Sequence, residues 1–331
     1  MNIITEEQLD AWLISIARER SLLAPRNDGG VIQYRPIKTS DKIAWDFSRP
    51  QMSIKDVFFP PTERLITIER VGKKVTLTET LPESMPVIFG VRPCDARGMQ
   101  ILDALFLDSA PVDPYYARRR ENTTLIGLAC KEMGPSCFCT SVGGAPDDTS
   151  GLDILLNDVD GGFVLQTLTE KGQLLLQGLS LAGFYGELPE PVLHQPLALV
   201  DRAAWLTHFQ DEYWERMSER CLSCRICAYV CPTCRCFAVR DEALSVPGQY
   251  ERIRCWDSCA GENYRRIAGG HKPRAEKGDR LRNRFMCKFY YYSEQYDLNQ
   301  AAACTGCGRC VDACPVNVDI TEVLIEVGRL P

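Results

Sequence analysis

The sequence has little histidine and no long apolar run, and each shortage argues against a class of protein. Only three histidines occur in 331 residues, His194, His208 and His271, so a histidine-rich metal site or extensive acid–base catalysis has little support. No uninterrupted apolar stretch approaches the roughly 18–20 residues that a membrane-spanning helix needs. The net charge of −6 gives no reason to expect nucleic-acid binding.

Motifs for binding nucleotides and haem are also missing. No G-x-G-x-x-G follows a strand pattern, and there is no G-x-x-x-x-G-K-[ST], so both common phosphate-binding fingerprints are absent. Cys-x-x-Cys-His, the signature of covalently attached haem, is absent too. The N-terminal segment lacks the apolar h-region of a secretory signal. We therefore expect a cytoplasmic protein without a membrane span, and we expect any flavin or nicotinamide chemistry on another chain.

Cysteine, in contrast, is abundant. The chain contains 17 cysteines, far more than an ordinary intracellular protein carries without metal. A disulfide-rich secreted scaffold would need an export signal. In a reducing compartment, cysteine at this density indicates metal ligation.

Two cysteine runs near the C-terminus share the spacing Cys-x2-Cys-x2-Cys-x3-Cys-Pro, the ligand pattern of bacterial-type ferredoxins. In two-cluster ferredoxins the fourth cysteine of each run binds the other run's cluster. We therefore assign a first [4Fe-4S] cluster to Cys221, Cys224, Cys227 and Cys314. We assign a second to Cys304, Cys307, Cys310 and Cys231. Zinc knuckles or buried free thiols are the alternatives, which the repeated rhythm and the shared proline disfavour.

The first eighty residues show alternating helix and strand patterns. Thr5 and Gln8 fit a capping box, and the apolar spacing that follows predicts an amphipathic helix ending near Pro25. Short strands are predicted at 31–37 and 43–47. Residues 65–70 and 75–80 predict a hairpin.

Two continuous apolar runs, 86–91 and 124–129, have the character of strands buried on both faces of a parallel sheet. Asp95 can cap a helix between them, which gives a strand–helix–strand crossover unit. Cys94 and Cys130 would then lie at the carboxyl ends of parallel strands, where open α/β sheets place their ligand sites.

Two further cysteines, Cys137 and Cys139, follow closely in a glycine-flanked segment. Cys94, Cys130, Cys137 and Cys139 thus converge on one edge of the predicted sheet. Four thiolates can hold a [4Fe-4S] cluster or a structural zinc ion. We favour a third [4Fe-4S] cluster here, with zinc or ordinary thiols as the alternatives.

The order of the predicted strands, linker and helix divides the chain into two domains. Strand patterns continue at 153–159 and 163–169, and a stretch rich in proline and charge at 186–196 predicts a linker. A helix over about 198–220 leads into Cys221. We predict an α/β (α+β) domain at 1–190 carrying the four-cysteine site, and a mainly α-helical, two-cluster ferredoxin-like domain at 191–331.

A long insertion, about 233–303, separates the two ferredoxin runs. It carries five more cysteines: Cys234, Cys236, Cys255, Cys259 and Cys287. We expect these to be ordinary thiols, some of them beside a cluster ligand, rather than a further cluster. The insertion is also basic, with Arg265, Arg266, Lys272, Arg274, Lys277, Arg280, Arg282, Arg284 and Lys288. This stretch is either a solvated surface, or a docking surface or charge that tunes the nearby anionic clusters.

Several of these motifs together resemble one known family. They are GVRPCDARG (90–98), CFCTSVGG (137–144), CLSCRICAYVCPTCRCF (221–237), WDSC (256–259), AGGHKPR (268–274) and CTGCGRCVDACPV (304–316). The family is the iron–sulfur subunit that sulfhydrogenase (as its beta subunit) and anaerobic sulfite reductase have in common. The resemblance spans nearly the whole chain. One departure is Cys287, where the family often has histidine before the lysine at 288.

This resemblance implies a non-catalytic electron-transfer subunit of an oxidoreductase complex. Such a subunit passes electrons between a flavoprotein, which binds FAD and NAD(P)H, and a catalytic subunit. The catalytic partner is a nickel–iron hydrogenase in one case and a sirohaem reductase in the other. We expect the hydrogenase or sulfhydrogenase type, with a sulfite reductase or another flavin-based complex as the alternative. A free-standing iron–sulfur enzyme with its substrate near Cys94, and a zinc-structured interaction module, are less favoured.

Overall fold

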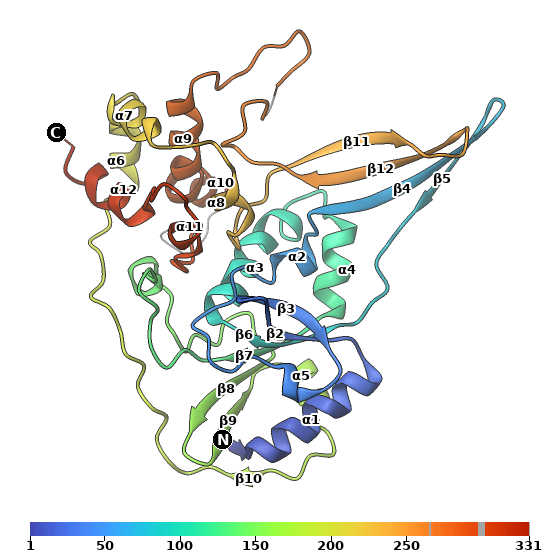
Figure 1. Cartoon of the computed structure of the whole chain (residues 1–331), viewed down its shortest axis with the longest axis vertical. Coiled ribbons are helices and arrows are strands. Elements are labelled where there is room, and N and C mark those ends of the chain that lie inside the picture. The colour runs from blue at the N-terminus through green and yellow to red at the C-terminus, as the bar shows by residue number, and fades with distance from the viewer. Residues whose placement is uncertain (265, 297–301, 331) are drawn as a thin grey trace.

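A computed structural model describes residues 1–264, 266–296 and 302–330, with the side chain of residue 41 left out. It shows a strand-rich N-terminal region and a helical C-terminal region joined by a second sheet (Figure 1). Among the helices in these ranges, none is both long and apolar enough to cross a membrane.

The larger sheet has eight strands in the order β10-β1-β9-β8-β7-β6-β2-β3. They are β1 (Asn2–Ile4), β2 (Leu22–Asp28), β3 (Val31–Ile37), β6 (Val87–Val91), β7 (Thr124–Leu128), β8 (Ile154–Val159), β9 (Gly162–Thr167) and β10 (Ala182–Gly183). The central strands β2, β6, β7 and β8 run parallel, and the outer pairs are antiparallel. The parallel pairing of β6 with β7 confirms the predicted crossover unit.

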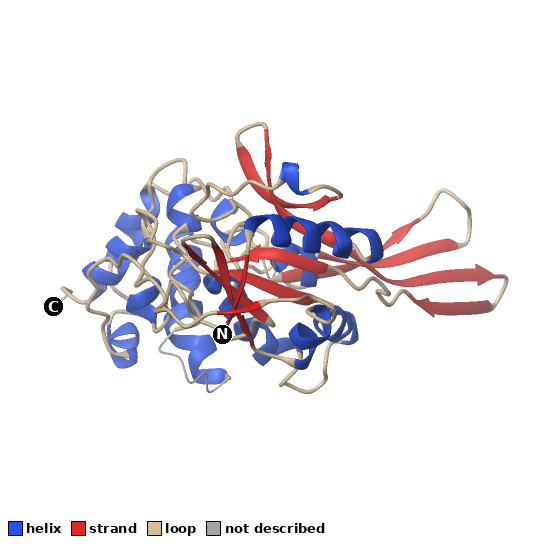
Figure 2. Cartoon of the chain, turned by 90° about the horizontal axis from the view of Figure 1, so that it is seen from below, coloured by secondary structure: helices blue, strands red, loops and turns tan. Residues whose placement is uncertain are grey.

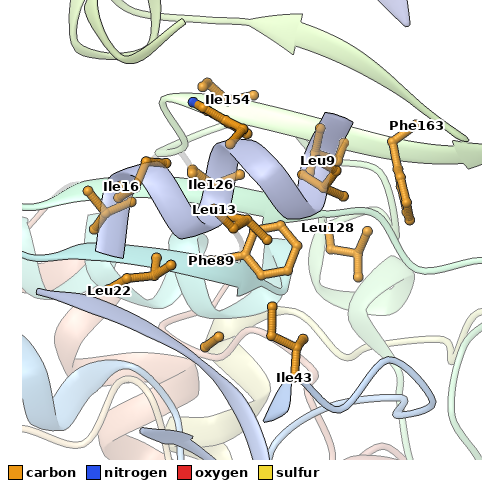
Figure 3. Close-up of a cluster of buried hydrophobic side chains, with 14 of the residues drawn as sticks. Leu9, Leu13, Ile16, Leu22, Ile43, Phe89, Ile126, Leu128, Ile154 and Phe163 are labelled. Atoms are coloured by element: carbon orange, nitrogen blue, oxygen red, sulfur yellow. The ribbon is translucent and has the colours of Figure 1, made fainter. Parts of the chain in front are cut away.

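Helices cover both faces of this sheet. They are α1 (Glu6–Glu19), α2 (Lys55–Phe58), α3 (Pro93–Phe106), α4 (Pro114–Asn122) and α5 (Glu170–Leu175), with the 3-10 turns η1 (Ser40–Lys42) and η2 (Cys139–Val142). Helix α1 packs Leu9, Leu13 and Ile16 over Phe89 and Ile126 of the sheet (Figure 3). Helices α2, α3 and α4 pack on the opposite face. This two-sided burial is why β6 and β7 are continuously apolar.

A second sheet joins segments that are far apart in the sequence. Its order is β11-β12-β4-β5, with β4 (Thr62–Val71), β5 (Lys74–Glu79), β11 (Phe237–Ala243) and β12 (Gln249–Trp256). The hairpin β4–β5 is the predicted one, and β12 from the insertion pairs antiparallel with β4. The sheet projects from the body of the molecule (Figure 2). The pairing crosses the boundary that we predict near residue 190, and that boundary stays a prediction.

The C-terminal region consists of short helices around its own apolar core. They are α6 (Arg202–Thr207), α7 (Tyr213–Glu219), α8 (Ile226–Tyr229), α9 (Lys277–Met286), the π-helical turn η3 (Cys287–Tyr291), α10 (Tyr292–Gln295), α11 (Arg309–Asp312) and α12 (Ile320–Val327). Trp205, Trp214 and Phe285 are fully buried here, together with side chains of α12. The aromatic residues before Cys221 therefore pack against the cluster domain, as predicted.

Several predicted elements are wrong in detail. Residues 43–47 form no strand, because the chain turns through η1 and then runs irregularly. The helix over 198–220 is two helices, since the chain turns after Thr207 and the Asp211 carboxylate accepts a hydrogen bond from the backbone N–H of Tyr213 at 2.7 Å. Helix α1 ends at Glu19, and Pro25 lies within the strand β2. Asp95 is not a cap, because α3 already begins at Pro93.

Candidate metal centres

The two ferredoxin-type runs follow the same backbone path. The residue before the second cysteine is left-handed in each, Ser223 with φ 54° and Gly306 with φ 63°. The residue after the second cysteine is left-handed as well, Arg225 with φ 69° and Gly308 with φ 72°. A short helix follows each time, α8 in the first run and α11 in the second. The shared spacing therefore produces one loop fold twice.

Backbone amides donate to sulfur in both runs. The N–H of Ser223 lies 3.4 Å from Cys221 Sγ, and that of Gly306 lies 3.5 Å from Cys304 Sγ. The N–H of Val318 lies 3.1 Å from Cys314 Sγ. Such donors stabilise negative charge on sulfur, and they are one way in which a protein sets the potential of an iron–sulfur cluster.

The fourth cysteine of the first run, Cys231, lies beside the second run. Burial raises the pKa of Cys304 to about 11, Lys288 opposes this, and the Cys231 thiolate adds to the increase. Burial likewise raises the pKa of Cys310 to about 12, again with a contribution from Cys231. Next to Cys231, Thr233 Oγ1 donates to the carbonyl of Ala303 at 3.0 Å. These contacts agree with the crossed ligand set, which stays a prediction.

Buried cations face these sulfurs. Lys288, 4% exposed, places its Nζ 3.1 Å from Cys231 Sγ. Arg284 is 2% exposed, and its Nε and Nη2 have no hydrogen-bond partner in the part of the chain that the structure describes. Burial disfavours the charge of Arg284, but the thiolates of Cys227 and Cys310 outweigh this and raise its pKa. Part of the basic stretch is therefore interior, and its cations face sulfur rather than water.

The residues of the two runs fit [4Fe-4S] clusters. Cysteine thiolates are the ligands that such clusters take, and a bound cluster with four thiolates carries net negative charge. That charge would compensate Arg284 and Lys288, whose charges are buried beside sulfur. All 17 cysteines are free thiols. Within the described ranges no group of three or more histidine, cysteine, aspartate or glutamate side chains is closed around a metal-sized position, and this holds for the ferredoxin-type runs too.

The four N-terminal cysteines line one pocket. Cys94 lies at the start of α3, Cys130 follows β7, Cys137 lies in the loop before η2, and Cys139 begins η2. Cys307 of the second run lines the same pocket. The carboxyl edge of the parallel sheet therefore brings together the cysteines that we predicted there, and it places them against a ferredoxin-type cysteine.

Cations also border this pocket. Arg49 Nη1 lies 3.2 Å from Cys137 Sγ, and Arg92 is buried with Nη1 2.9 Å from the carbonyl of Ala129. Burial raises the pKa of Cys139 to about 11, and Cys137 and Cys130 contribute to the increase. Mutual repulsion among these thiolates would fall if they shared a cation or cluster, so the donor set fits one.

Tight backbone contacts join this pocket to the second ferredoxin run. The N–H of Phe138 donates to the carbonyl of Gly306 at 2.8 Å. A Cβ on Gly306 would lie 2.6 Å from Cys139 Cα, and one on Gly308 would meet the backbone of Ser136. Only glycine allows both this close approach and the left-handed backbone of the loop.

A buried ion pair that the sequence did not predict holds the two sites together. Asp95, next to Cys94, pairs with Arg309, next to Cys310, at 2.6 and 2.7 Å. Both side chains are at most 2% exposed. The sequence shows that each residue adjoins a cysteine, but their partnership spans more than two hundred residues and depends on tertiary structure.

Comparison with known proteins agrees with this arrangement. Residues 220–318 match a family model described as a 4Fe-4S dicluster domain, which covers both runs and the insertion between them. Over 320 residues the chain is 30% identical to the sulfhydrogenase 2 subunit beta of Pyrococcus furiosus (strain ATCC 43587 / DSM 3638 / JCM 8422 / Vc1). The match covers 92% of this chain and 91% of that subunit. The chain belongs to the sulfhydrogenase beta-subunit family.

This beta-subunit membership confirms the family resemblance that the cysteine motifs indicate. The chain is an iron–sulfur protein of the electron-transfer kind, with a 4Fe-4S dicluster domain behind a strand-rich N-terminal region. The similarity extends through the N-terminal half, so the beta-subunit family shares more than the ferredoxin-type runs. No solved structure matches the chain.

Proposed function

We propose that this chain relays electrons between a protein that binds FAD and NAD(P)H and a catalytic subunit of the hydrogenase or sulfhydrogenase type. One observation carries the proposal, namely the continuity of the cysteine sites. Cys307, in the second ferredoxin-type run, also lines the pocket of the four N-terminal cysteines. A series of neighbouring centres suits electron relay, whereas a single catalytic site would need only one.

The proposal includes three [4Fe-4S] clusters. Two would be held by the crossed cysteine sets and one by Cys94, Cys130, Cys137 and Cys139. When bound, each cluster supplies a one-electron centre. The protein's own residues hold the sulfurs, donate backbone hydrogen bonds to them, and place Lys288 and Arg284 where they favour negative charge.

The third cluster is favoured over zinc by its surroundings. A structural zinc site would stabilise the local loop without needing a neighbouring redox centre. Here Asp95 and Arg309 hold the pocket rigidly against the second run, and Cys137 Sγ lies 3.8 Å from the carbonyl of Cys307. Rigid, close placement of two centres is what electron transfer between them requires.

The proposed partners follow from the family's name and from what the chain lacks. The relative is one subunit of a sulfhydrogenase, and this sequence has no dinucleotide or flavin fingerprint. FAD and NAD(P)H therefore belong to a partner in this proposal, as does the catalytic metal. The cysteine density suits a reducing, cytoplasmic setting.

Anaerobic affinity purification from the native host tests the function. We expect a flavoprotein and a nickel-binding catalytic subunit to co-purify, and we expect NAD(P)H to bleach the cluster absorbance near 400 nm in the complex but not in the isolated chain. A co-purifying sirohaem protein would move the chain to the sulfite reductase branch. Reduction of the isolated chain by NAD(P)H would overturn the relay proposal.

The double variant Cys137→Ser with Cys139→Ser tests the proposed third cluster. We expect it to lose about four irons per chain and to slow electron transfer through the complex, while the two ferredoxin-type clusters remain. Loss of about one zinc ion instead, with electron transfer unchanged, would contradict the third cluster.

A further inference from the structure

Four cysteines of the insertion gather at a place that the ferredoxin-type runs and the N-terminal pocket leave unused. They are Cys234, Cys236, Cys259 and Cys287. The pairing of β11 with β12 ends at Phe237 opposite Trp256, so the chain leaves this ladder with Cys236 beside Asp257. The N–H of Asp257 donates to the carbonyl of Cys236 at 2.8 Å, and the tight turn that follows brings Cys259 back to Cys236.

Two of these thiols, Cys236 and Cys259, contact each other through sulfur, and Cys234 contacts Cys231 of the first ferredoxin-type run. Cys236 and Cys259 share a side-chain hydrogen bond, and Tyr264 Oη lies 3.2 Å from Cys236 Sγ. Arg235, between Cys234 and Cys236, places Nη2 3.2 Å from Cys287 Sγ and stacks on the Tyr292 ring at 3.4 Å. Cys234 and Cys287 both lie close enough to Cys259 for their negative charge to raise the pKa of the Cys259 thiol.

The setting of Cys287 is also unusual. It begins the π-helical turn η3, and the next residue, Lys288, binds Cys231 Sγ. Single π-turns within helices are frequent at functional sites. Here the turn directs Cys287 toward Arg235 and Lys288 toward the ferredoxin-type run.

Charge provides the second, independent observation. Arg235 lies within the segment 231–236, and Lys55, Arg284 and Lys288 lie around it. Lys55 is 1% exposed, and its Nζ lies 3.2 Å from the carbonyl of Cys234. In the described ranges none of the four cations forms an ion pair with a carboxylate. Cations in such positions are costly without anions. Arg235 and Lys55 lie beside Cys287 and Cys234, which are outside both ferredoxin-type ligand sets.

We propose that Cys234, Cys236, Cys259 and Cys287 hold a further iron–sulfur cluster of the [4Fe-4S] class. Four thiolates complete its ligand set, and the anionic cluster compensates Arg235 and Lys55. The segment 231–236 links it directly to the second ferredoxin-type centre through Cys231. The site therefore extends the series of centres beyond the ferredoxin-type runs. It departs from our expectation of ordinary thiols in the insertion.

Cysteine replacement with metal analysis tests the site. The variants are Cys287→Ser and the double variant Cys236→Ser with Cys259→Ser, each purified anaerobically as the full chain with its co-purifying partners. Compared with the wild type, each should lose about four irons and about four sulfides per chain. Cys255→Ser is the matched control: Cys255 lies in β12 within the same insertion but outside the set, and this variant should lose none.

The test uses the difference in iron content between each variant and the wild type, rather than the total iron per chain. Failure of the proposed N-terminal cluster would change the total iron and leave this difference intact, so the two ideas fail separately. Folding is checked by the reduced-state EPR signal of the ferredoxin-type clusters, which the Cys287→Ser variant should keep. Unchanged iron in both variants, loss of about one zinc ion per chain, or a Cys236–Cys259 disulfide in the native protein would each overturn the proposal.

If the double variant does not fold, the wild-type protein still provides a test. Native mass spectrometry of the anaerobic chain should show one more cluster mass than the Cys287→Ser variant. Equal masses would overturn the site without any use of the double variant.

Discussion

At the scale of single residues, buried positive charges border the cysteine sites of this protein. Lys288 and Arg284 contact or face sulfur in the ferredoxin-type region, and Arg49 does so in the N-terminal pocket. A positive charge beside a cluster stabilises the more negative, reduced state. These side chains are therefore expected to raise cluster potentials rather than to bind a partner.

Lys288→Met should lower the potential of the cluster that we propose Cys231 binds. Removing a unit charge near this sulfur removes about 1.4–2.8 kcal/mol of stabilisation from the reduced state at an effective dielectric constant near 20. For one electron this is a fall of roughly 60–120 mV. EPR-monitored redox titration of the complex measures it, with iron content as a check on occupancy.

Lys73→Met provides the control for that measurement. Lys73 is exposed in the turn between β4 and β5. The same charge is lost there, and no potential should move because solvent screens it. A Lys288→Met potential equal to the wild type would mean that the cation does not act on the cluster.

Titration of the Asp56 carboxyl group makes the stability of the protein depend on pH. Burial raises its pKa to about 6, from an ordinary value of 3.8, despite Lys55 and Arg35 nearby. Because the folded-state pKa is the higher one, the stability contribution is complete below about pH 4 and is lost as pH rises through 6. Above pH 6 the native state holds a poorly solvated carboxylate, and Asp56 Oδ1 has no hydrogen-bond partner in the described structure.

Asp56→Asn should therefore stabilise the protein at pH 8. We expect about 1–3 kcal/mol, reduced from the full shift because the side chain is partly exposed, which corresponds to a few degrees in unfolding temperature. The gain should shrink at pH 5.5. Anaerobic thermal scans at the two pH values measure it, with the exposed Asp108→Asn as control. A gain that is equal at both pH values would contradict the titration of Asp56.

At the scale of elements, the four-stranded sheet couples the insertion to the N-terminal region. The key contact is Glu63 on β4, whose carboxylate accepts hydrogen bonds from Arg254 on β12 and Arg119 on α4. Glu63 and Arg254 side chains are each 3% exposed. Arg254 also pairs with Asp113, which precedes α4, so the network ties the sheet to that helix at two points.

Glu63→Ala should destabilise this junction. It leaves Arg254 buried with one carboxylate partner fewer, a change that costs about 3–5 kcal/mol for a buried pair. Amide hydrogen exchange should speed up along β4 and β12. Asp241→Ala is the control in the same sheet, because the Asp241–Arg252 pair is about half exposed and solvent screens it, so it contributes little to stability. Equal protection in both variants would show that strand pairing alone holds the junction.

At the scale of the whole molecule, the two main cores depend differently on metal. The core under α1 contains no cysteine among its described residues, while the C-terminal core includes Cys304 and packs against Cys221, Cys310 and Cys314. The helices around the ferredoxin-type runs are short, with four residues each in α8 and α11. Such helices are marginal without tertiary contacts.

Oxidative removal of iron with a chelator should unfold one part of the chain preferentially. We expect amide protection to fall across residues 220–318 and to persist in β6, β7 and α1, because the latter core is entirely side-chain packing. Hydrogen exchange of apo and holo protein compares the two. A uniform loss of protection, or none, would show that the clusters do not hold the C-terminal region together.

Local patterns in the sequence were sufficient to predict the family, the dicluster domain and the strands at the centre of the larger sheet. Cysteine spacing fixes a loop fold, and the continuous apolar runs of β6 and β7 reflect burial on both faces. The four cysteines of the N-terminal pocket were also predictable, because parallel strands bring their carboxyl ends to one edge.

Contacts between distant segments, in contrast, became visible only in the fold. The Asp95–Arg309 pair, the joining of β12 to β4, the cations facing sulfur and the gathering of the insertion's cysteines all link residues that no local pattern relates. The physical reason is that charge pairing and strand pairing depend on distance in space. A basic residue in the sequence is equally compatible with solvent and with a buried thiolate, and only the fold determines which of the two surrounds Lys288.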